Sequence, residues 1–201
     1  MTKIRNMKKI ILMAFALLCL NSCVVGAEEE QGTEKYDSQL LQPGEAAPDF
    51  TITNADHPDG LRLSSLRGSY VVLEFWASWC PDCRRETPAV VEMYRKYVPL
   101  GVRFVGVSFD TDSTAWRKYI RENGMDWIQY SELKKWKNGT TLDGPYKVNW
   151  IPTFYLIDPQ GNIAACSVGT AKIKAALEAA VAESAGGGTA IGRKKESGEG
   201  L

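Results

Sequence analysis

The chain has 201 residues, and its 24 basic and 24 acidic residues give a formal net charge of zero. Without an excess of basic residues it offers no basic stripe to neutralise phosphates, so we expect no nucleic-acid partner. Hydrophobic residues make up 44% of the chain, enough for one globular domain with a substantial core.

Residues 1–22 have the pattern of a secretory signal peptide. Basic residues precede an unbroken apolar run from Ile10 to Leu20, which is shorter than the about 20 residues that span a bilayer. The run leads into Leu20–Asn21–Ser22–Cys23, which resembles the lipobox of bacterial lipoproteins and implies a lipid on Cys23. The alternative is an ordinary signal peptide with a chance cysteine. The lipid would anchor an extracytoplasmic protein to a bacterial membrane, on the periplasmic side or at the cell surface.

Two polar segments flank the remaining chain. Residues 23–42 contain Glu28–Glu29–Glu30 and few apolar residues, so we expect a flexible tether. Residues 185–201 begin with a glycine run and continue as a polar mixture, which predicts a disordered tail. Residues 43–184 between them form the predicted domain.

The domain alternates strand and helix patterns. In chain order we expect a short strand at 49–54, a strand entry and turn at 61–66, a buried strand from Tyr70 to Ala77, a helix from Pro81 to about Tyr97, a buried strand from Val102 to Phe109, a helix from Asp112 or Ser113 to Asn123, a hairpin of Thr153–Ile157 and Asn162–Val168, and a helix from Lys172 to Ala182. This order predicts an α/β domain with a mixed central sheet and helices on both faces.

Cys80 and Cys83 stand at a predicted junction between a strand and a helix. Their spacing puts both sulfurs on one face of the first helical turn, close enough to form a disulfide. The unpaired N–H groups and partial positive charge of a helix N-terminus favour a thiolate at Cys80. Such a thiolate can attack a disulfide in another protein, and Cys83 can then resolve the mixed disulfide. We therefore predict a redox-active, catalytic pair.

Other roles for this pair fit less well. A structural disulfide across so short a loop would stabilise the fold little. A zinc site would need two further ligands, whereas Cys166 lies in a predicted strand and His57 in a predicted turn. Covalent haem attachment would need a histidine where the sequence has Arg84. We expect no metal and no cofactor, and we expect Cys166 to be an inert buried thiol.

The residues around the pair resemble the thioredoxin superfamily. The segment that resembles its active-site strand and WCxxC element is VVLEFWASWCPDC, residues 71–83. Three flanking segments narrow the resemblance to the extracytoplasmic TlpA/ResA-like, AhpC/TSA-redoxin-like branch: Pro48–Asp49–Phe50, Leu63–Ser64–Ser65–Leu66–Arg67–Gly68 and Arg84–Arg85–Glu86–Thr87–Pro88. The resemblance covers about residues 43–180 and implies a thioredoxin-like three-layer sandwich.

Trp150–Ile151–Pro152–Thr153 resembles a second element of this superfamily. The resemblance implies that the Ile151–Pro152 bond is cis and lies against the cysteines. Ile151, Pro152 and Thr153 would then pair with an extended substrate peptide by strand addition. The alternative is a proline that merely begins a strand. Trp79 and Pro81 complete the predicted substrate surface, although Trp79, like Trp76, is expected mainly to pack around the site.

Glu74 interrupts the apolar strand before the cysteines. A buried carboxylate is costly unless it is paired or protonated. Glu74 occupies the place where many thioredoxins carry a buried aspartate, and this resemblance implies that it accepts a proton from the resolving cysteine. A raised pKa would suit that role. The alternative is a structural carboxylate paired with a lysine or arginine.

We therefore expect a thiol–disulfide oxidoreductase that acts on cysteine pairs of exported proteins. Asp82 beside Cys80 and the buried Glu74 should both oppose a thiolate, which favours a reductant over an oxidant. A reductant outside the cytoplasm needs a membrane thiol electron donor. One alternative is a thiol peroxidase of the peroxiredoxin type, although no matching threonine precedes Cys80. A second is a peptide-binding lipoprotein without redox turnover.

Overall fold

The computed structural model of the protein describes residues 33–137 and 139–186. The predicted signal peptide, the predicted lipidation site at Cys23 and residues 187–201 of the predicted tail lie outside the described residues. Within the described ranges, no helix is both long enough and apolar enough to cross a membrane.

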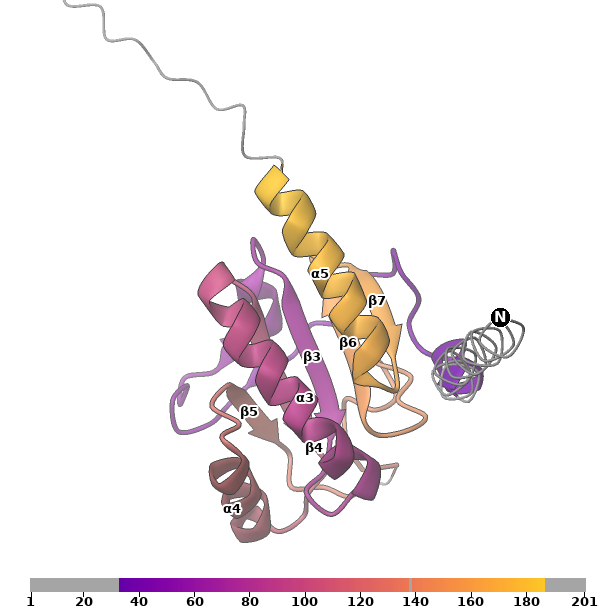
Figure 1. Ribbon diagram of the computed structural model, residues 1–201. Helices are drawn as coiled ribbons and strands as arrows, with labels where there is room; N and C mark the ends of the chain where they lie inside the picture. The colour runs from indigo at the N-terminus through magenta and orange to yellow at the C-terminus, as the bar shows by residue number, and fades with distance from the viewer. Residues whose placement is uncertain (1–32, 138, 187–201) are drawn as a thin grey trace, which may run out of the picture.

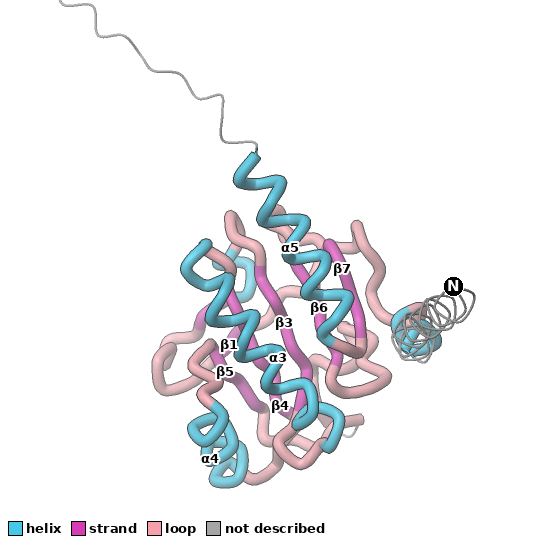
Figure 2. The backbone as a smooth tube through the Cα atoms, in the orientation of Figure 1, coloured by secondary structure: helices cyan, strands magenta, loops and turns pink. Residues whose placement is uncertain are grey.

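A five-stranded sheet in the order β5-β4-β3-β6-β7 forms the middle layer (Figures 1 and 2). Its strands are β3 (Val71–Trp76), β4 (Arg103–Ser108), β5 (Ile128–Ser131), β6 (Thr153–Ile157) and β7 (Ile163–Ser167). Strand β4 pairs in parallel with β3 and β5, whereas the pairs β3–β6 and β6–β7 are antiparallel. The sheet is therefore mixed, as the sequence predicts.

Strand β3 lies at the centre of the sheet. All six of its residues are buried, which requires the near-continuous apolar run that the sequence shows there. Glu74 is its charged residue, and its neighbours across the sheet are Gly106 on β4 and Phe154 on β6.

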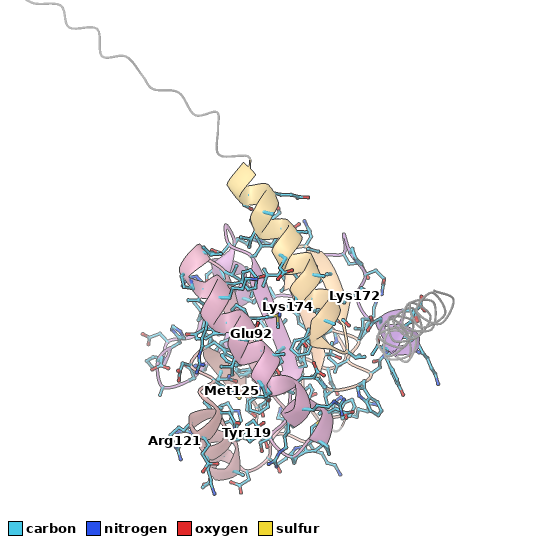
Figure 3. All side chains as sticks on the ribbon, in the orientation of Figure 1. Glu92, Tyr119, Arg121, Met125, Lys172 and Lys174 are labelled. Carbon is cyan, nitrogen blue, oxygen red and sulfur yellow. The ribbon has the colours of Figure 1, made fainter. Side chains whose placement is uncertain are left out.

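Three long helices cover one face of the sheet: α3 (Pro81–Tyr97), α4 (Ser113–Asn123) and α5 (Thr170–Gly186). The connections β3–α3–β4 and β4–α4–β5 step toward the same edge, and right-handed crossovers in one direction place both helices on one face. Tyr119 of α4 accordingly contacts Trp76 of β3 and Thr87 of α3. Helix α5 lies beside α3, where Lys174 pairs with Glu92 at 3.2 Å (Figure 3).

The opposite face carries none of these three helices. It is covered by the N-terminal segment, with β1 (Thr51–Ile52) and β2 (Leu61–Arg62), and by residues 132–150. The ring of Tyr146 packs there on Phe75, with ring centroids 4.9 Å apart. The third layer of the sandwich, on this side of the sheet, is thus built largely from loops and their aromatic side chains.

Residues 33–42, which we expected in a flexible tether, pack on the domain instead. Leu40 and Leu41 are buried, and the Asp37 carboxylate accepts the Val168 N–H at 2.9 Å. The tether prediction was wrong for these residues because composition averages over a segment. Two adjacent leucines are enough to dock a short stretch on an apolar surface that the rest of the chain has formed.

Strands β5 and β1 also differ from the expectation. No strand is predicted at Ile128–Ser131, because a run of four residues shows too little periodicity. The strand expected at 49–54 is confined to Thr51–Ile52, which pairs with β2 in a separate two-stranded sheet.

Candidate active site

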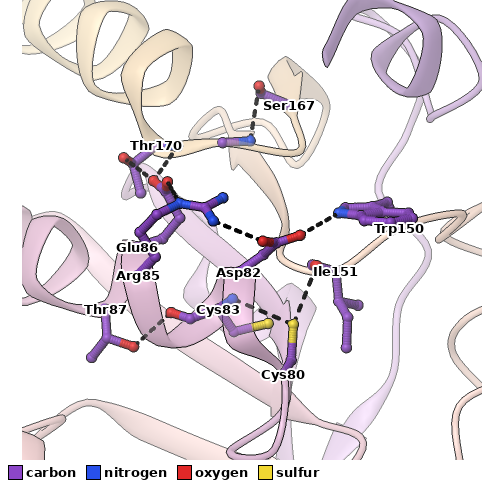
Figure 4. Close-up of polar contacts among 11 residues, drawn as sticks. Cys80, Asp82, Cys83, Arg85, Glu86, Thr87, Trp150, Ile151, Ser167 and Thr170 are labelled. Carbon is purple, nitrogen blue, oxygen red and sulfur yellow. Dashed lines mark hydrogen bonds and ion pairs between the residues drawn. The ribbon is translucent and has the colours of Figure 1, made fainter. Parts of the chain in front are cut away.

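The cysteine pair lies where β3 leads into α3. Cys80 caps the helix N-terminus, Pro81 is the first helical residue, and Cys83 follows in the first turn. The Cys83 N–H donates a hydrogen bond to Cys80 Sγ at 3.3 Å (Figure 4). Both cysteines are free thiols, with Cys80 5% exposed and Cys83 1% exposed. The two sulfurs therefore share a nearly enclosed site at a helix N-terminus.

The two thiols differ in acidity. Hydrogen bonds from the Cys83 thiol and from the backbone N–H groups of Cys83 and Asp82 lower the pKa of Cys80 to about 7, against opposing effects of burial and of the Asp82 carboxylate. Burial, the hydrogen bond to Cys80 and the nearby Glu74 raise the pKa of Cys83 far above its ordinary value. Near neutral pH, Cys80 is thus partly a thiolate while Cys83 keeps its proton.

A buried carboxylate holds the loop that carries Cys80. Asp110, just after β4, accepts the Ser78 N–H at 2.9 Å and the Ser78 hydroxyl at 2.6 Å, and it also accepts the Ser108 hydroxyl. Asp110 is 2% exposed, so these hydrogen bonds compensate for its burial. This residue is not among those predicted from the sequence. The sequence feature that points to it is an acidic residue at the end of a predicted buried strand.

The segment around Pro152 faces Cys80. The Ile151–Pro152 peptide bond is cis, as the family resemblance implied. The Cys80 thiol donates to the Ile151 carbonyl oxygen at 3.4 Å (Figure 4). The Thr153 hydroxyl is buried and donates to the Trp150 carbonyl at 2.7 Å, so it fixes this loop rather than facing solvent.

Two exposed tryptophans border the pair. Trp79 is 53% exposed and Trp150 is 39% exposed, whereas Trp76 is fully buried. The Trp150 indole donates to Asp82 at 3.2 Å and packs on the ring of Tyr36. Trp76 is thus part of the core, whereas Trp79 lies at the surface beside the pair. The exposed position of Trp150 is not predicted from the sequence.

Glu86 joins the active-site helix to its neighbour. Its carboxylate accepts the N–H of Thr170 at 3.2 Å and the Thr170 hydroxyl at 2.6 Å, at the first residue of α5 (Figure 4). The Asp82 carboxylate accepts a hydrogen bond from Arg85 at 2.8 Å on the exposed side of the same turn. The first turns of α3 and α5 are thereby held together beside the cysteines.

Glu74 lies on the face of β3 that α3 covers. It is 2% exposed, and neither carboxylate oxygen has a hydrogen-bond partner among the described residues. Burial, with a smaller contribution from Glu86, raises its pKa to about 8. The alternative of a structural ion pair with a lysine or arginine is thus wrong. The Glu74 carboxyl, which stays protonated near neutral pH, lies close enough to Cys83 to influence the pKa of the Cys83 thiol.

The remaining candidates lie away from the pair. Cys166 is buried in β7, and His57 lies in a turn that Asn54 stabilises. Among residues 33–137 and 139–186, no three histidine, cysteine or acidic side chains are grouped so that they could hold a metal ion.

Comparisons with known proteins match this geometry. The model of the AhpC/TSA family matches residues 43–166. The thiol-disulfide oxidoreductase ResA of Oceanobacillus iheyensis is 32% identical over 162 residues, covering 79% of this chain and 81% of the relative. ResA of Bacillus cereus strain ZK is 30% identical over 158 residues, covering 78% and 87%.

A solved structure shows the same fold. The thioredoxin domain of a thiol-disulfide oxidoreductase from Bacteroides vulgatus superposes with a TM-score of 0.62 at 28% identity, covering 70% of this chain and 99% of that domain. The expected thioredoxin-like fold is therefore confirmed. With its CxxC pair at the start of α3, the chain belongs to the AhpC/TSA family and is a thioredoxin-like thiol–disulfide oxidoreductase of the ResA/TlpA type.

Proposed function

We propose that the protein reduces disulfides of exported proteins with the Cys80–Cys83 dithiol. The observation that carries this proposal is the unequal acidity of two thiols that share one helix turn. A thiol with a pKa of about 7 is a good nucleophile at neutral pH, whereas its neighbour stays protonated until it is needed.

The reaction takes place in two exchanges. The Cys80 thiolate attacks one sulfur of a target disulfide, forms a mixed disulfide and releases the first target thiolate. Glu74 in its ionised form, the minor form near neutral pH, then accepts the Cys83 proton, and the Cys83 sulfur attacks Cys80 Sγ. The second target thiolate leaves, the target has gained two electrons, and the Cys80–Cys83 disulfide has formed.

A target peptide would lie along the backbone next to Pro152. The closeness of Cys80 Sγ to the Ile151 carbonyl supports this, because an extended peptide paired there would bring its disulfide to Cys80. Trp79 and Trp150 would border the peptide, since both are exposed. Thr153 would support the loop from inside.

The direction of transfer follows from the Cys80 thiolate. A pKa of about 7 resembles that of thioredoxin, whereas strongly oxidising proteins stabilise the thiolate much further. A lipid on Cys23 would hold the enzyme on the extracytoplasmic side of a bacterial membrane. A membrane thiol electron donor would then return the Cys80–Cys83 disulfide to the dithiol.

The reduction potential tests the direction. The full chain is equilibrated with glutathione and dithiothreitol buffers, and the fraction of Cys80–Cys83 disulfide is measured. We expect a potential near the thioredoxin value of about −270 mV. A potential near about −120 mV would make the protein a disulfide donor, and a pair that does not exchange would overturn the proposal.

A further inference from the structure

Three polar side chains gather on the buried face of the sheet, behind the cysteines. The strand register pairs Glu74 of β3 with Gly106 of β4, and Gly106 with Gln129 of β5. The three residues thus form one row across adjacent strands and share a face. Trp76 lies two residues after Glu74 on the same strand, and alternate residues of a strand point the same way.

Gly106 lets the ends of these side chains approach one another. A Cβ atom at this position would lie 2.5 Å from Gln129 Oε1 and 3.1 Å from Trp76 Nε1. The Gln129 amide and the Trp76 indole therefore meet above the Gly106 backbone, beside the register partner of Glu74. Any larger residue at 106 would displace them.

None of these polar ends has a hydrogen-bond partner within the described chain, and none is bonded to another of the three. Trp76 is 0% exposed, Glu74 2% and Gln129 8%. Both Glu74 oxygens, the Trp76 indole nitrogen, and the Gln129 amide oxygen and nitrogen lack hydrogen bonds to described residues. Buried polar groups are costly unless they are hydrogen-bonded, so we expect internal water to bridge these groups.

Their chemistry is complementary. An indole N–H can only donate, a carboxyl can accept, and an amide does both. The Gln129 amide can therefore accept from Trp76 and donate to Glu74. A single internal water would also suit the site, because such waters make about three hydrogen bonds and three groups converge here.

We propose that Gln129 is a positioning residue that joins Glu74 and Trp76 in one buried hydrogen-bond network through one internal water. Its consequence for catalysis rests on the proposed function of Glu74 as the proton acceptor of Cys83. A donor aimed at a carboxylate favours the ionised form. The network would thus adjust how readily Glu74 takes up and releases a proton.

Few titratable groups face Glu74 from the elements packed around it. Helix α3 contributes Cys83 and Glu86, which interact with it electrostatically, and α4 contributes Tyr119 next to Trp76. The neighbouring strands place Gly106 and Phe154 opposite it, and neither titrates.

The Trp76 indole N–H provides a direct measurement. In the reduced full chain labelled with ¹⁵N-tryptophan, its NMR signal is assigned with Trp76→Phe and followed against pH. We expect the signal to titrate with Glu74 and to stop doing so in Glu74→Gln. Gln129→Leu should move the midpoint upward by about one pH unit, because the ionised carboxyl loses a donor.

Two further variants make the result specific. Gly106→Ala should also move the midpoint, since its Cβ would push the Gln129 amide away, and it serves if Gln129→Leu fails to fold. Val105→Ala removes buried volume from the neighbouring residue on the other face of β4, and it should leave the midpoint unchanged. An unchanged midpoint in Gln129→Leu or Gly106→Ala would overturn the network. So would a Trp76 signal that titrates in Glu74→Gln as it does in the wild type.

The titration also separates this inference from the proposed function, because it needs no substrate. If the midpoint moves but the wild-type pair exchanges no disulfide, the network stands and the reductase proposal falls. If the wild-type pair exchanges disulfides but the midpoint does not move in the variants, the reductase proposal stands and the network falls.

Discussion

Cys80 Sγ lies 3.4 Å from the carbonyl oxygen of Ile151, although 71 positions separate the two residues in the chain. This contact brings the nucleophile against the segment that includes the cis Ile151–Pro152 bond. A peptide paired with this segment, as proposed above, would therefore lie next to the Cys80 sulfur. The predictions below concern this pair and the parts of the fold that hold it.

Cys83→Ser should stop turnover but leave the first exchange intact. Cys80 could still attack a target disulfide, and no second thiol would resolve the product. We expect a mixed disulfide to accumulate, visible by mass spectrometry under non-reducing conditions. Cys166→Ala is the matched control, because that buried thiol lies away from the pair and should leave turnover unchanged. Full turnover in Cys83→Ser would exclude the two-step mechanism.

The alkylation rate of Cys80 should rise with pH around a midpoint near 7, because the thiolate is the reacting form. Asp82→Asn should lower that midpoint, since the Asp82 carboxylate raises the pKa of Cys80. Glu122→Gln removes an exposed acid from α4 and serves as the control. A midpoint that rises in Asp82→Asn would contradict this account of the site.

The buried Glu74 should make stability depend on pH. Its pKa is about 8 in the folded protein and 4.5 in its ordinary state, so the folded form holds the proton more tightly between these values. The stabilisation is therefore complete below about pH 4.5 and is lost as the pH rises through about 8, with a slope of up to about 1.4 kcal/mol per pH unit. Glu74→Gln should flatten this slope in urea unfolding measured at several pH values. Equal slopes in the two proteins would show that Glu74 is not protonated as inferred.

Asp110→Ala should loosen the loop that carries Cys80. It removes the acceptor for the Ser78 N–H, the Ser78 hydroxyl and the Ser108 hydroxyl inside the protein. We expect a loss of about 2–4 kcal/mol in the free energy of unfolding. We also expect slower thiol–disulfide exchange by Cys80. Asp112→Ala removes only an exposed helix cap and should cost about 1 kcal/mol. Equal losses in both variants would refute the loop-holding role of Asp110.

Leu40→Ala tests whether the segment before residue 43 belongs to the domain. Leu40 is 1% exposed, so we expect a loss of about 2–5 kcal/mol in the free energy of unfolding. Gln39→Ala changes an exposed neighbour and should cost almost nothing. An unaltered stability in Leu40→Ala would restore the flexible tether.

The sequence by itself determined the features that depend on neighbouring residues. The apolar run around β3, the helix of residues Pro81–Tyr97 and the hairpin strand Thr153–Ile157 are local patterns, and the structure has them at or near the predicted bounds. The spacing of Cys80 and Cys83 likewise defined the redox pair, because a helix turn alone brings their sulfurs together.

Only the tertiary structure decided which distant groups meet. The tertiary structure brings Asp110 to Ser78, Leu40 to the surface of the domain and Gln129 over Gly106. These contacts depend on strand order and register, which no short sequence pattern contains. Helices α3 and α4 fall on one face because their two crossovers step in the same direction, and the strand order that sets this is absent from the local sequence. Burial and charge acting across such contacts then set the acidity of Cys80, Cys83 and Glu74.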